Sequence, residues 1–335
     1  MEAFGSLHAS ADPSYSTSFP PPTLGSLHTR YRLPKNATCE LLLAVCASSV
    51  NPSDIHPSIA SPDYPKVYGS DVAGRVVNVN GTCSRLEIGN LVWGDIGANA
   101  HLLSSGAKTK ELGGYAAYAV ALESQLSKVP ANIGCAEAGS LGKVALTSYK
   151  ALRWYGGAPF APNASVLVLG GSGGTGATGI QLSKAYGAAR VTTTTSAANA
   201  DFVRSLGANS VIDYHSQNWW EVLADGQFDA IYDTVGEAGT GARAMRKLRD
   251  GGFYVTITGA LATSVPPGKH QAMFINSDTN LGSAPLLDEL SALIAADKLR
   301  MRRIDSTFGL SKVSDAFARS ATGHAVGKIS IEVGS

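Results

Sequence analysis

The feature that most constrains this chain is a glycine cluster that directly follows a run of valines and leucines. Residues 165–169 read Ser-Val-Leu-Val-Leu, and residues 170–176 read Gly-Gly-Ser-Gly-Gly-Thr-Gly. Gly171, Gly173 and Gly176 have the spacing G-x-G-x-x-G, and a helix-capable segment follows them. This order predicts a buried parallel strand, a tight glycine turn and a helix with unpaired first N–H groups. Because such groups bind phosphate, the stretch predicts a dinucleotide site, against the alternative of a turn made only for packing.

Length and composition place the chain among globular proteins of about two domains. It has 335 residues, of which 44% are hydrophobic and 16% charged, and its formal net charge is +1. This charge gives no reason to expect nucleic acid or an anionic membrane as a partner. No apolar run approaches the roughly 20 residues that span a bilayer, and residues 1–30 lack the apolar segment of a secretory signal. We expect a cytoplasmic protein, with a cleaved organelle peptide left open because this end is poor in acidic residues.

The four cysteines give no sign of a metal centre. Cys39, Cys46, Cys83 and Cys135 are scattered and form no C-x-x-C pair. Such a distribution favours buried, reduced thiols over disulfides or a metal site.

The first third of the chain has the pattern of an all-β unit. Residues 1–30 are rich in serine and proline and give no clear element, and Phe-Pro-Pro-Pro at 19–22 predicts irregular or extended chain. Short apolar runs separated by turns then continue to about residue 127, which is typical of a small barrel. The strands expected here cover residues 40–47, 69–79, 91–93 and 115–120.

Beyond residue 127 the pattern changes to alternating helices and strands. A helix is expected over residues 136–154, and the alternation that follows predicts βαβ units and a parallel sheet. The glycine cluster then lies at the carboxyl edge of that sheet, where ligands bind. The expected strands are 164–169, 190–195, 210–214, 228–233 and 253–258, and the expected helices are 199–206, 219–223 and 241–248. The end of the chain predicts helices at 285–298 and 310–319 and a strand at 328–333.

Several short motifs, taken in order, resemble one family. They are Ser-Val-Asn-Pro-Ser-Asp at 49–54, Gly-Ser-Asp-Val-Ala-Gly at 69–74, Gly-Gly-Thr-Gly at 173–176, Ser-Leu-Gly-Ala at 205–208, Val-Ile-Asp-Tyr at 211–214 and Gly-Lys-Ile at 327–329. Over nearly its whole length the chain resembles the zinc-independent medium-chain dehydrogenases/reductases of the quinone oxidoreductase and enoyl reductase group. The resemblance implies an α/β protein with a GroES-like β domain and a Rossmann domain, which is a doubly wound parallel sheet. We expect the first domain at 1–127, the Rossmann domain at 128–275 and a return to the first domain at 276–335.

The resemblance also argues against a metal. Zinc-dependent relatives carry a cysteine at the position of Asn51 and a His-Glu pair at Ser70 and Asp71. They also carry a four-cysteine lobe, whereas residues 94–114 contain no cysteine. Since Asp71 alone cannot supply the three ligands of a catalytic zinc site, we expect no metal.

The end of the second strand of the parallel sheet indicates the cofactor. Thr194, Thr195 and Ser196 stand where NAD-binding chains usually present an acidic residue to the ribose. Hydroxyls accommodate a 2′-phosphate, so we expect NADPH. NADPH-using relatives have a serine near Ser196, a lysine near Asn199 and a tyrosine at Tyr214; the lysine is missing here. The candidate cofactor-binding residues are Thr147, Gly171, Ser172, Gly173, Gly174, Thr175, Gly176, Thr195, Ser196, Asn199, Tyr214, Thr258 and Gly259.

The catalytic candidates lie in the first domain. Asn51 either donates its amide to the nicotinamide or substrate oxygen, or only forms an Asn-Pro turn. His56 replaces a tyrosine of many relatives and is either a proton donor or a surface histidine. Tyr64 and Tyr68 are either phenol donors or packing residues of the cleft wall. Thr147 either touches the nicotinamide side or is a hydroxyl buried in its helix.

The resemblance implies hydride transfer to a small-molecule acceptor, either a quinone or the C=C bond of an α,β-unsaturated carbonyl. An enoyl-thioester reductase of lipid or polyketide metabolism is an alternative within the class. A non-catalytic NADPH-binding protein on the same scaffold is an alternative outside it. The segments 253–258 and 271–276 are suited to edge-to-edge pairing in a homodimer.

Overall fold

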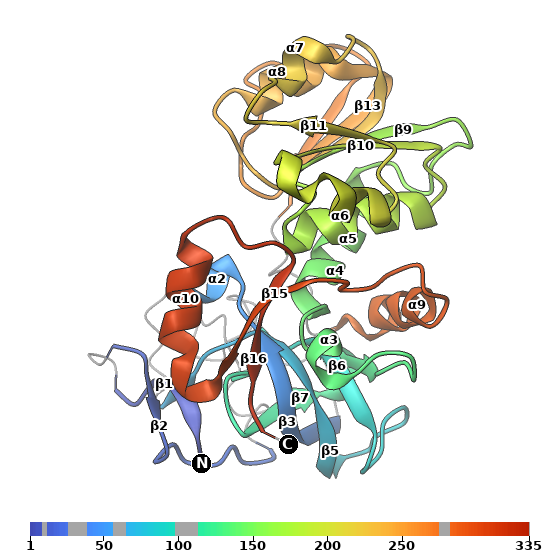
Figure 1. Ribbon diagram of the computed structural model, residues 1–335. Helices are drawn as coiled ribbons and strands as arrows, with labels where there is room; N and C mark the ends of the chain where they lie inside the picture. The colour runs from blue at the N-terminus through green and yellow to red at the C-terminus, as the bar shows by residue number, and fades with distance from the viewer. Residues whose placement is uncertain (9–11, 26–38, 56–64, 98–112, 275–281, 335) are drawn as a thin grey trace. The chain divides into compact units, whose positions relative to one another are not determined.

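A computed structural model describes residues 1–8, 12–25, 39–55, 65–97, 113–274 and 282–334 (Figure 1). The chain forms two compact units, one of residues Met1–Leu146 and Asn276–Ser335, the other of residues Thr147–Ile275. We call them the β unit and the parallel-sheet unit. No helix within the described ranges is long and apolar enough to cross a membrane. The candidates His56 and Tyr64 lie outside the described residues.

The parallel-sheet unit contains one six-stranded sheet, in which every neighbouring pair of strands is parallel. Its spatial order is β11-β10-β9-β12-β13-β14, which is the doubly wound order expected of a dinucleotide-binding sheet. All five residues of β9 are buried, which explains their unbroken apolar character. The strands are β9 (Ser165–Leu169), β10 (Arg190–Thr195), β11 (Ser210–Asp213), β12 (Phe228–Asp233), β13 (Leu248–Thr256) and β14 (His270–Met273).

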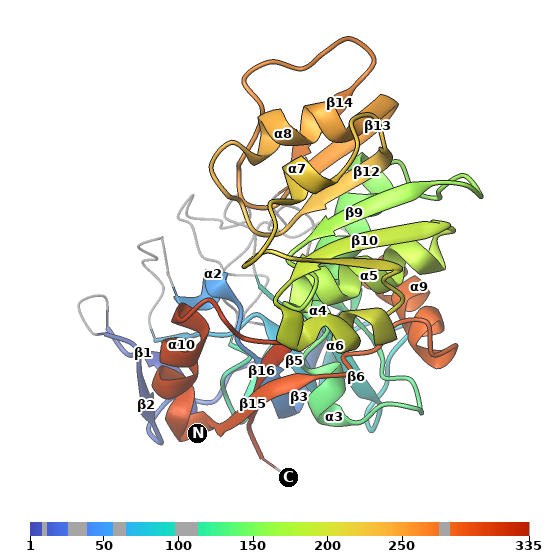
Figure 2. The ribbon, with the colours of Figure 1, turned by 45° about the horizontal axis from the view of Figure 1, so that its top comes forward.

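Helices cover both faces of this sheet. Figures 1 and 2 show α5 (Gly174–Ala185) and α6 (Ala200–Ser205) on one face, and α7 (Trp219–Val222) and α8 (Thr240–Lys247) on the other. A 3₁₀ turn, η4 (Ala197–Asn199), leads into α6. Successive strands are added toward one edge of the sheet from β9 to β11 and toward the other edge from β12 to β14, and the loop after β9 opens at this switch point.

The β unit is built on a seven-stranded sheet that joins strands from residues 39–128 with strands from residues 304–332. Its order is β15-β16-β3-β5-β6-β8, and β7 also pairs with β3. β16 lies antiparallel to β3, with Ile331 opposite Ser48, so the last strand completes the sheet that the first long strand begins. The strands are β3 (Cys39–Ser49), β5 (Asp71–Gly81), β6 (Leu91–Asp95), β7 (Tyr118–Leu122), β8 (Leu126–Lys128), β15 (Ile304–Gly309) and β16 (Lys328–Glu332).

The N-terminal segment is more ordered than its composition predicts. A small sheet joins β1 (Ala3–Ser6), β2 (Ser14–Ser16) and β4 (Lys66–Val67) in the order β2-β1-β4. Phe4 and Phe19 are each only 2% exposed, and Phe4 belongs to the main core of the β unit. Residues 1–30 gave no clear element in the sequence, whereas the structure has two short strands there. Strands of three or four residues are too short to show a period in the sequence.

The helix expected over residues 136–154 is interrupted. The structure has α3 (Cys135–Ala138), α4 (Gly142–Lys150) and a π-helical turn, η3 (Ala151–Tyr155). A Cβ at Gly139 would crowd the backbone of Ala47, and one at Gly142 would crowd that of Gly94. The chain therefore turns where only glycine allows the close approach. Because α3 packs on β3 and β5, the compact units divide after Leu146 rather than near residue 127.

The remaining helical segments belong to the β unit. They are α2 (Pro52–Ile55), η2 (Glu123–Gln125), α9 (Ala284–Ala295), η7 (Leu310–Lys312) and α10 (Val313–Ala321). Val313 and Ala316 of α10 join the main core of this unit, which explains the apolar spacing of that segment.

All four cysteines are paired, as Cys39–Cys83 and Cys46–Cys135. The expectation of reduced thiols is therefore wrong. The paired Cα atoms lie 4.9 Å and 6.2 Å apart, although their sequence separations are 44 and 89 residues. Sheet register explains the first pair, since Cys39 lies opposite Gly81 at the end of β5, and Cys83 follows directly. Sequence spacing alone contains no trace of this pairing.

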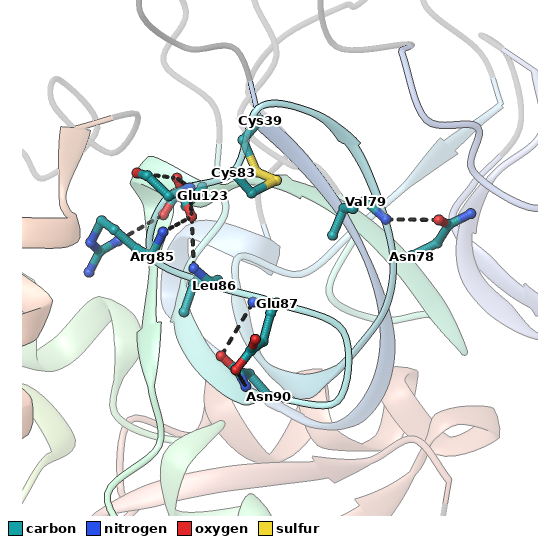
Figure 3. The surroundings of a disulfide bond; sticks show 10 residues. Cys39, Asn78, Val79, Cys83, Arg85, Leu86, Glu87, Asn90 and Glu123 are labelled. Carbon is teal, nitrogen blue, oxygen red and sulfur yellow. Dashed lines mark hydrogen bonds between the residues drawn. A yellow bond between two sulfur atoms is a disulfide. The ribbon is translucent and has the colours of Figure 1, made fainter.

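Beside the first disulfide, Glu123 holds the loop that follows β5 (Figure 3). Its carboxylate accepts the backbone N–H groups of Ser84, Arg85 and Leu86, at 3.0, 2.6 and 2.8 Å. Burial raises the pKa of Glu123, but these N–H groups outweigh burial and leave the pKa below its ordinary value of 4.5. The ionised carboxylate therefore fastens the loop.

We expect Glu123→Gln to lower the free energy of unfolding at neutral pH by about 1–3 kcal/mol, because an amide oxygen replaces only part of the acceptor capacity. A lowered folded-state pKa stabilises above the unfolded value and loses that contribution as pH falls through the folded value. The difference between wild type and variant should thus shrink on acidification below pH 4.5. Urea titrations at several pH values test this, and a pH-independent difference would contradict it.

Candidate functional site

The glycine loop joins β9 to α5 at the switch point of the parallel sheet. Gly170 has φ of 80°, and its N–H donates to Thr194 Oγ1 at 2.9 Å. The N–H of Gly171 donates to the carbonyl of Thr194 at 3.0 Å. Gly173 is the N-cap of α5, with φ of −74° and ψ of 163°, and no side chain caps this helix. The loop is thus fastened to β10, and the first turn of α5, which includes Thr175 and Gly176, presents uncapped backbone N–H groups.

The glycines of this loop serve different purposes. A Cβ at Gly171 would collide with the hydroxyl of Thr193, and one at Gly176 would collide with the carbonyl of Gly170. These two glycines allow helix and strand to pack closely. At Gly173 the nearest protein atom to an added Cβ is Gly170 O at 3.6 Å, which is ordinary contact. The space beside Gly173 is therefore open, as a phosphate approaching the helix N-terminus requires.

A buried hydroxyl network supports the loop from behind. Ser148 Oγ lies 3.0 Å from Thr175 O, 2.8 Å from Thr178 Oγ1 and 3.3 Å from Tyr232 Oη. Burial raises the pKa of Tyr232, so its phenol stays protonated and is available as a donor. Thr147, the preceding residue on α4, is 7% exposed. These hydrogen bonds hold the first turn of α5 close to Tyr232 of β12.

Four of the candidates meet at the end of β10. Asn199 Nδ2 donates to Ser196 Oγ at 3.0 Å, and the N–H of Tyr214 donates to Thr195 O at 3.3 Å. Tyr214 is 48% exposed, and its ring lies 4.3 Å from that of His215. Among the described residues, Thr195 Oγ1 is buried and has no hydrogen-bond partner. By contrast, Thr194 Oγ1 accepts a hydrogen bond from the N–H of Gly170.

At the ends of β12 and β13 the sequence missed an organising residue, Asp233. Its carboxylate accepts the Tyr254 hydroxyl at 2.9 Å, the Thr256 hydroxyl at 3.2 Å and the N–H groups of Val235 and Gly236 at 2.9 and 3.0 Å. Thr256 Oγ1 in turn bonds Thr258 Oγ1 at 2.8 Å. The sequence does offer a signal, because Asp233 is an acidic residue at the carboxyl end of a mostly apolar strand.

The last two cofactor candidates lie at the exposed end of this network. Thr258 and Gly259 are both exposed, and Gly259 has φ of 90°. They follow β13 at the same edge of the sheet as the glycine loop. Both stay available to a ligand at that edge.

In the β unit, Asn51 lies in a buried cluster rather than on a surface loop. It is 3% exposed, and its Nδ2 donates to Asp71 Oδ2 at 2.8 Å. Lys328 Nζ donates to Asn51 Oδ1 at 2.7 Å, to Val50 O at 2.7 Å and to Asp71 Oδ2 at 3.3 Å. Because lysine only donates and a carboxylate only accepts, the amide of Asn51 has one possible orientation. Both polar atoms of the Asn51 amide are thus hydrogen-bonded within the protein.

Asp54 extends this cluster. It accepts the Tyr115 hydroxyl at 2.6 Å, the Ser70 hydroxyl at 2.9 Å and the N–H of Asn51 at 2.9 Å. Burial raises the pKa of Asp54; Lys143 and Tyr115 oppose that effect, and nearby Asp71 adds to it. Asp54 thus keeps its proton to a higher pH than an ordinary aspartate.

Tyr68 is a core residue in this structure. It is 4% exposed, its ring packs edge-on against Phe4, and its hydroxyl lies 3.3 Å from Ser6 Oγ. The ammonium of Lys66 lies over the ring, 5.2 Å from its centroid. These contacts describe the packing role that the sequence left open for this residue.

Two lysines of the cluster were not among the site residues predicted from the sequence. Lys328 was seen only as part of a closing motif, and Lys143 only as part of a helix. Both are at least four-fifths buried, and each lies beside an aspartate. A lysine within an otherwise apolar strand, as in Lys-Ile-Ser-Ile, was the available signal for the first of them. Within the described ranges, no group of three or more His, Cys, Asp and Glu side chains is arranged to hold a metal ion.

Two family profiles match the chain, an alcohol dehydrogenase GroES-like domain over residues 37–131 and a zinc-binding dehydrogenase over residues 206–331. The 2-methylene-furan-3-one reductase of Solanum lycopersicum is 34% identical, covering 91% of this chain and 74% of that protein. The chloroplastic NADPH-dependent alkenal/one oxidoreductase of Arabidopsis thaliana is 32% identical, covering 90% and 74%. The solved quinone oxidoreductase from Coxiella burnetii has a TM-score of 0.75 and 25% identity, covering 100% and 99%. The chain belongs to the medium-chain dehydrogenase/reductase family, in its zinc-independent quinone oxidoreductase and enoyl reductase group.

Proposed function

We propose that this protein is an NADPH-dependent oxidoreductase that reduces quinones or the C=C bond of α,β-unsaturated carbonyls. The observation that carries the proposal is the open space at Gly173, at the uncapped start of α5 and at the switch point of a doubly wound sheet. The names of the tomato and Arabidopsis relatives, a furanone reductase and an alkenal/one oxidoreductase, support the substrate class.

The residues at the sheet edge fit the cofactor. Backbone N–H groups of Gly174, Thr175 and Gly176 would hold the pyrophosphate, beside the open face of Gly173. Ser172 belongs to the same loop, and Thr147, Thr258 and Gly259 would line the nicotinamide half. When bound, NADPH supplies the hydride from C4 of its dihydronicotinamide.

The end of β10 favours NADPH over NADH. Ser196, Asn199 and Tyr214 offer hydroxyl and amide groups, and the hydroxyl of Thr195 is unpartnered among the described residues. An acidic residue, which would repel a 2′-phosphate, is missing from the end of this strand. Asn199 stands where relatives place a lysine, so neutral donors would hold the phosphate on this side.

We expect purified protein to oxidise NADPH in the presence of at least one member of a panel of quinones, enals and enones. The fall of reduced-nicotinamide absorbance measures the reaction, and NADH at equal concentration should support a lower kcat/KM. NADPH binding in calorimetry without turnover on any acceptor would instead identify a non-catalytic binding protein. Turnover confined to enoyl thioesters would identify the thioester reductase.

We also propose a homodimer that pairs through β14. This strand lies at the edge of the sheet, and Met273 on it is 47% exposed. An open edge presents unpaired backbone groups, which a second copy of the strand satisfies. Sedimentation equilibrium tests the assembly, and a monomer at micromolar concentration would exclude it.

A further inference from the structure

The buried cluster of the β unit contains more charge than its fold requires. Asp54, Asp71 and Asp95 are each at most 1% exposed, and Lys143 and Lys328 lie beside them. Burying ionised groups costs several kcal/mol each unless partners compensate them. Replacement of such groups by apolar residues is often neutral or stabilising, so their presence needs another reason.

Lys143 is the exceptional member of this cluster. Its side chain is 17% exposed, whereas those of Asp95, Asp71 and Lys328 are 0%, 0% and 4% exposed. Lys143 Nζ lies 3.6 Å from Asp95 Oδ2, and its backbone N–H donates to Asp71 Oδ1 at 2.5 Å. Lys143 therefore has the most exposed side chain of these four charged residues.

The position of Lys143 also breaks a local rule. It is the second residue of α4, and a cation in the first turn opposes the positive end of the helix dipole. Ordinary stability selects an acidic residue there. A local rule broken in the presence of several compensating carboxylates is typical of a functional site.

We propose that Lys143 is a catalytic residue whose ammonium binds the carbonyl oxygen of the acceptor and protonates it during reduction. This inference rests on the proposed function. Lys143 and Thr147 are four residues apart on α4 and so share a face of that helix. Thr147 is one of the residues proposed above for the nicotinamide side, and Lys143 lies one helical turn before it on the same helix.

The proposed step is balanced. When bound, NADPH would supply a hydride to the β-carbon of the enone, and the π electrons of the C=C bond would move toward the carbonyl oxygen. The oxygen takes a proton from Nζ, which leaves an enol and a neutral amine. The enol then tautomerises to the saturated carbonyl, and water reprotonates Lys143. Preorganised charge at a developing oxyanion is a large source of catalysis.

The test compares Lys143→Met, Lys143→Arg and, as a matched control, Lys312→Met, whose side chain is 66% exposed. For Lys143→Met we expect kcat with an enone to fall about 100-fold or more, with little change in KM. Lys143→Arg keeps the charge that binds the oxygen but releases no proton at neutral pH, so its KM should stay near that of the wild type and its kcat should stay low. Lys312→Met should match the wild type.

A second readout needs no turnover. The 4-nitrophenolate anion resembles an enolate, and its visible absorbance reports how much of it is bound and ionised. Wild-type protein should bind it at least about tenfold more tightly than Lys143→Met does, because one charge-assisted hydrogen bond is lost. NADPH affinity and the circular dichroism spectrum should be the same in both proteins.

The outcomes separate the two proposals. If the wild type reduces enones and Lys143→Met matches it in kcat and in phenolate binding, the role of Lys143 is wrong and the function stands. If the wild type oxidises no NADPH, the proposed function fails, and the phenolate titration alone decides whether Lys143 holds an oxyanion. If Lys143→Met does not fold, Lys143→Arg decides: loss of phenolate binding despite the retained charge, or a kcat equal to that of the wild type, would contradict the proposal.

Discussion

Replacing Lys328 with methionine is expected to lower the free energy of unfolding of the β unit by about 3–5 kcal/mol. The ammonium donates to Val50 O, Asn51 Oδ1 and Asp71 Oδ2, and the side chain is 4% exposed. Methionine fills the volume but donates to none of them, so the carboxylate of Asp71 stays buried without its cation. Urea unfolding followed by circular dichroism measures the difference.

Two further proteins show that the loss comes from the buried pair. Lys312→Met removes an exposed ion pair with Asp315 and should change stability by less than about 1 kcal/mol. Lys328→Met combined with Asp71→Asn removes both charges, and its loss should be smaller than the sum of the single losses. Equal midpoints for Lys328→Met and wild type would contradict the assignment.

The sequence predicts the parallel sheet well because each of its strands can be recognised from a short stretch of consecutive residues. β10 and β12 have the expected bounds, since both are short, mostly buried runs that end in a polar residue or turn. Gly171, Gly173 and Gly176 were likewise readable, because the loop, its strand and its helix are adjacent in the chain.

The cluster around Asn51 was not predictable by the same means. Lys328 and Asp71 are 257 residues apart in the sequence, and only the pairing of β16 with β3 and of β3 with β5 brings them together. The same holds for Cys46 and Cys135, separated by 89 residues. The local sequence pattern predicts which helix or strand contains a residue. It does not predict which helices and strands become neighbours, and these pairs depend on that.

A substitution in the cofactor loop is expected to weaken NADPH binding without lowering the stability of the fold. Gly173→Asp places a carboxylate at the N-cap of α5, where φ of −74° and ψ of 163° suit aspartate and no side chain now caps the helix. The added Cβ meets only Gly170 O at 3.6 Å. The free energy of unfolding without cofactor should therefore stay unchanged or rise slightly. NADPH affinity should fall about 100-fold, because the carboxylate occupies and repels the phosphate position.

Two matched variants make the comparison decisive. Gly173→Asn has nearly the same shape without the charge, so its affinity for NADPH should lie between those of wild type and Gly173→Asp. Gly176→Ala should instead destabilise the fold, because its Cβ would meet the backbone of Gly170. Calorimetric titration with NADPH and urea unfolding give both quantities for each protein. Unchanged NADPH affinity in a folded Gly173→Asp protein would show that the pyrophosphate does not bind at the start of α5, and the proposed cofactor site would be wrong.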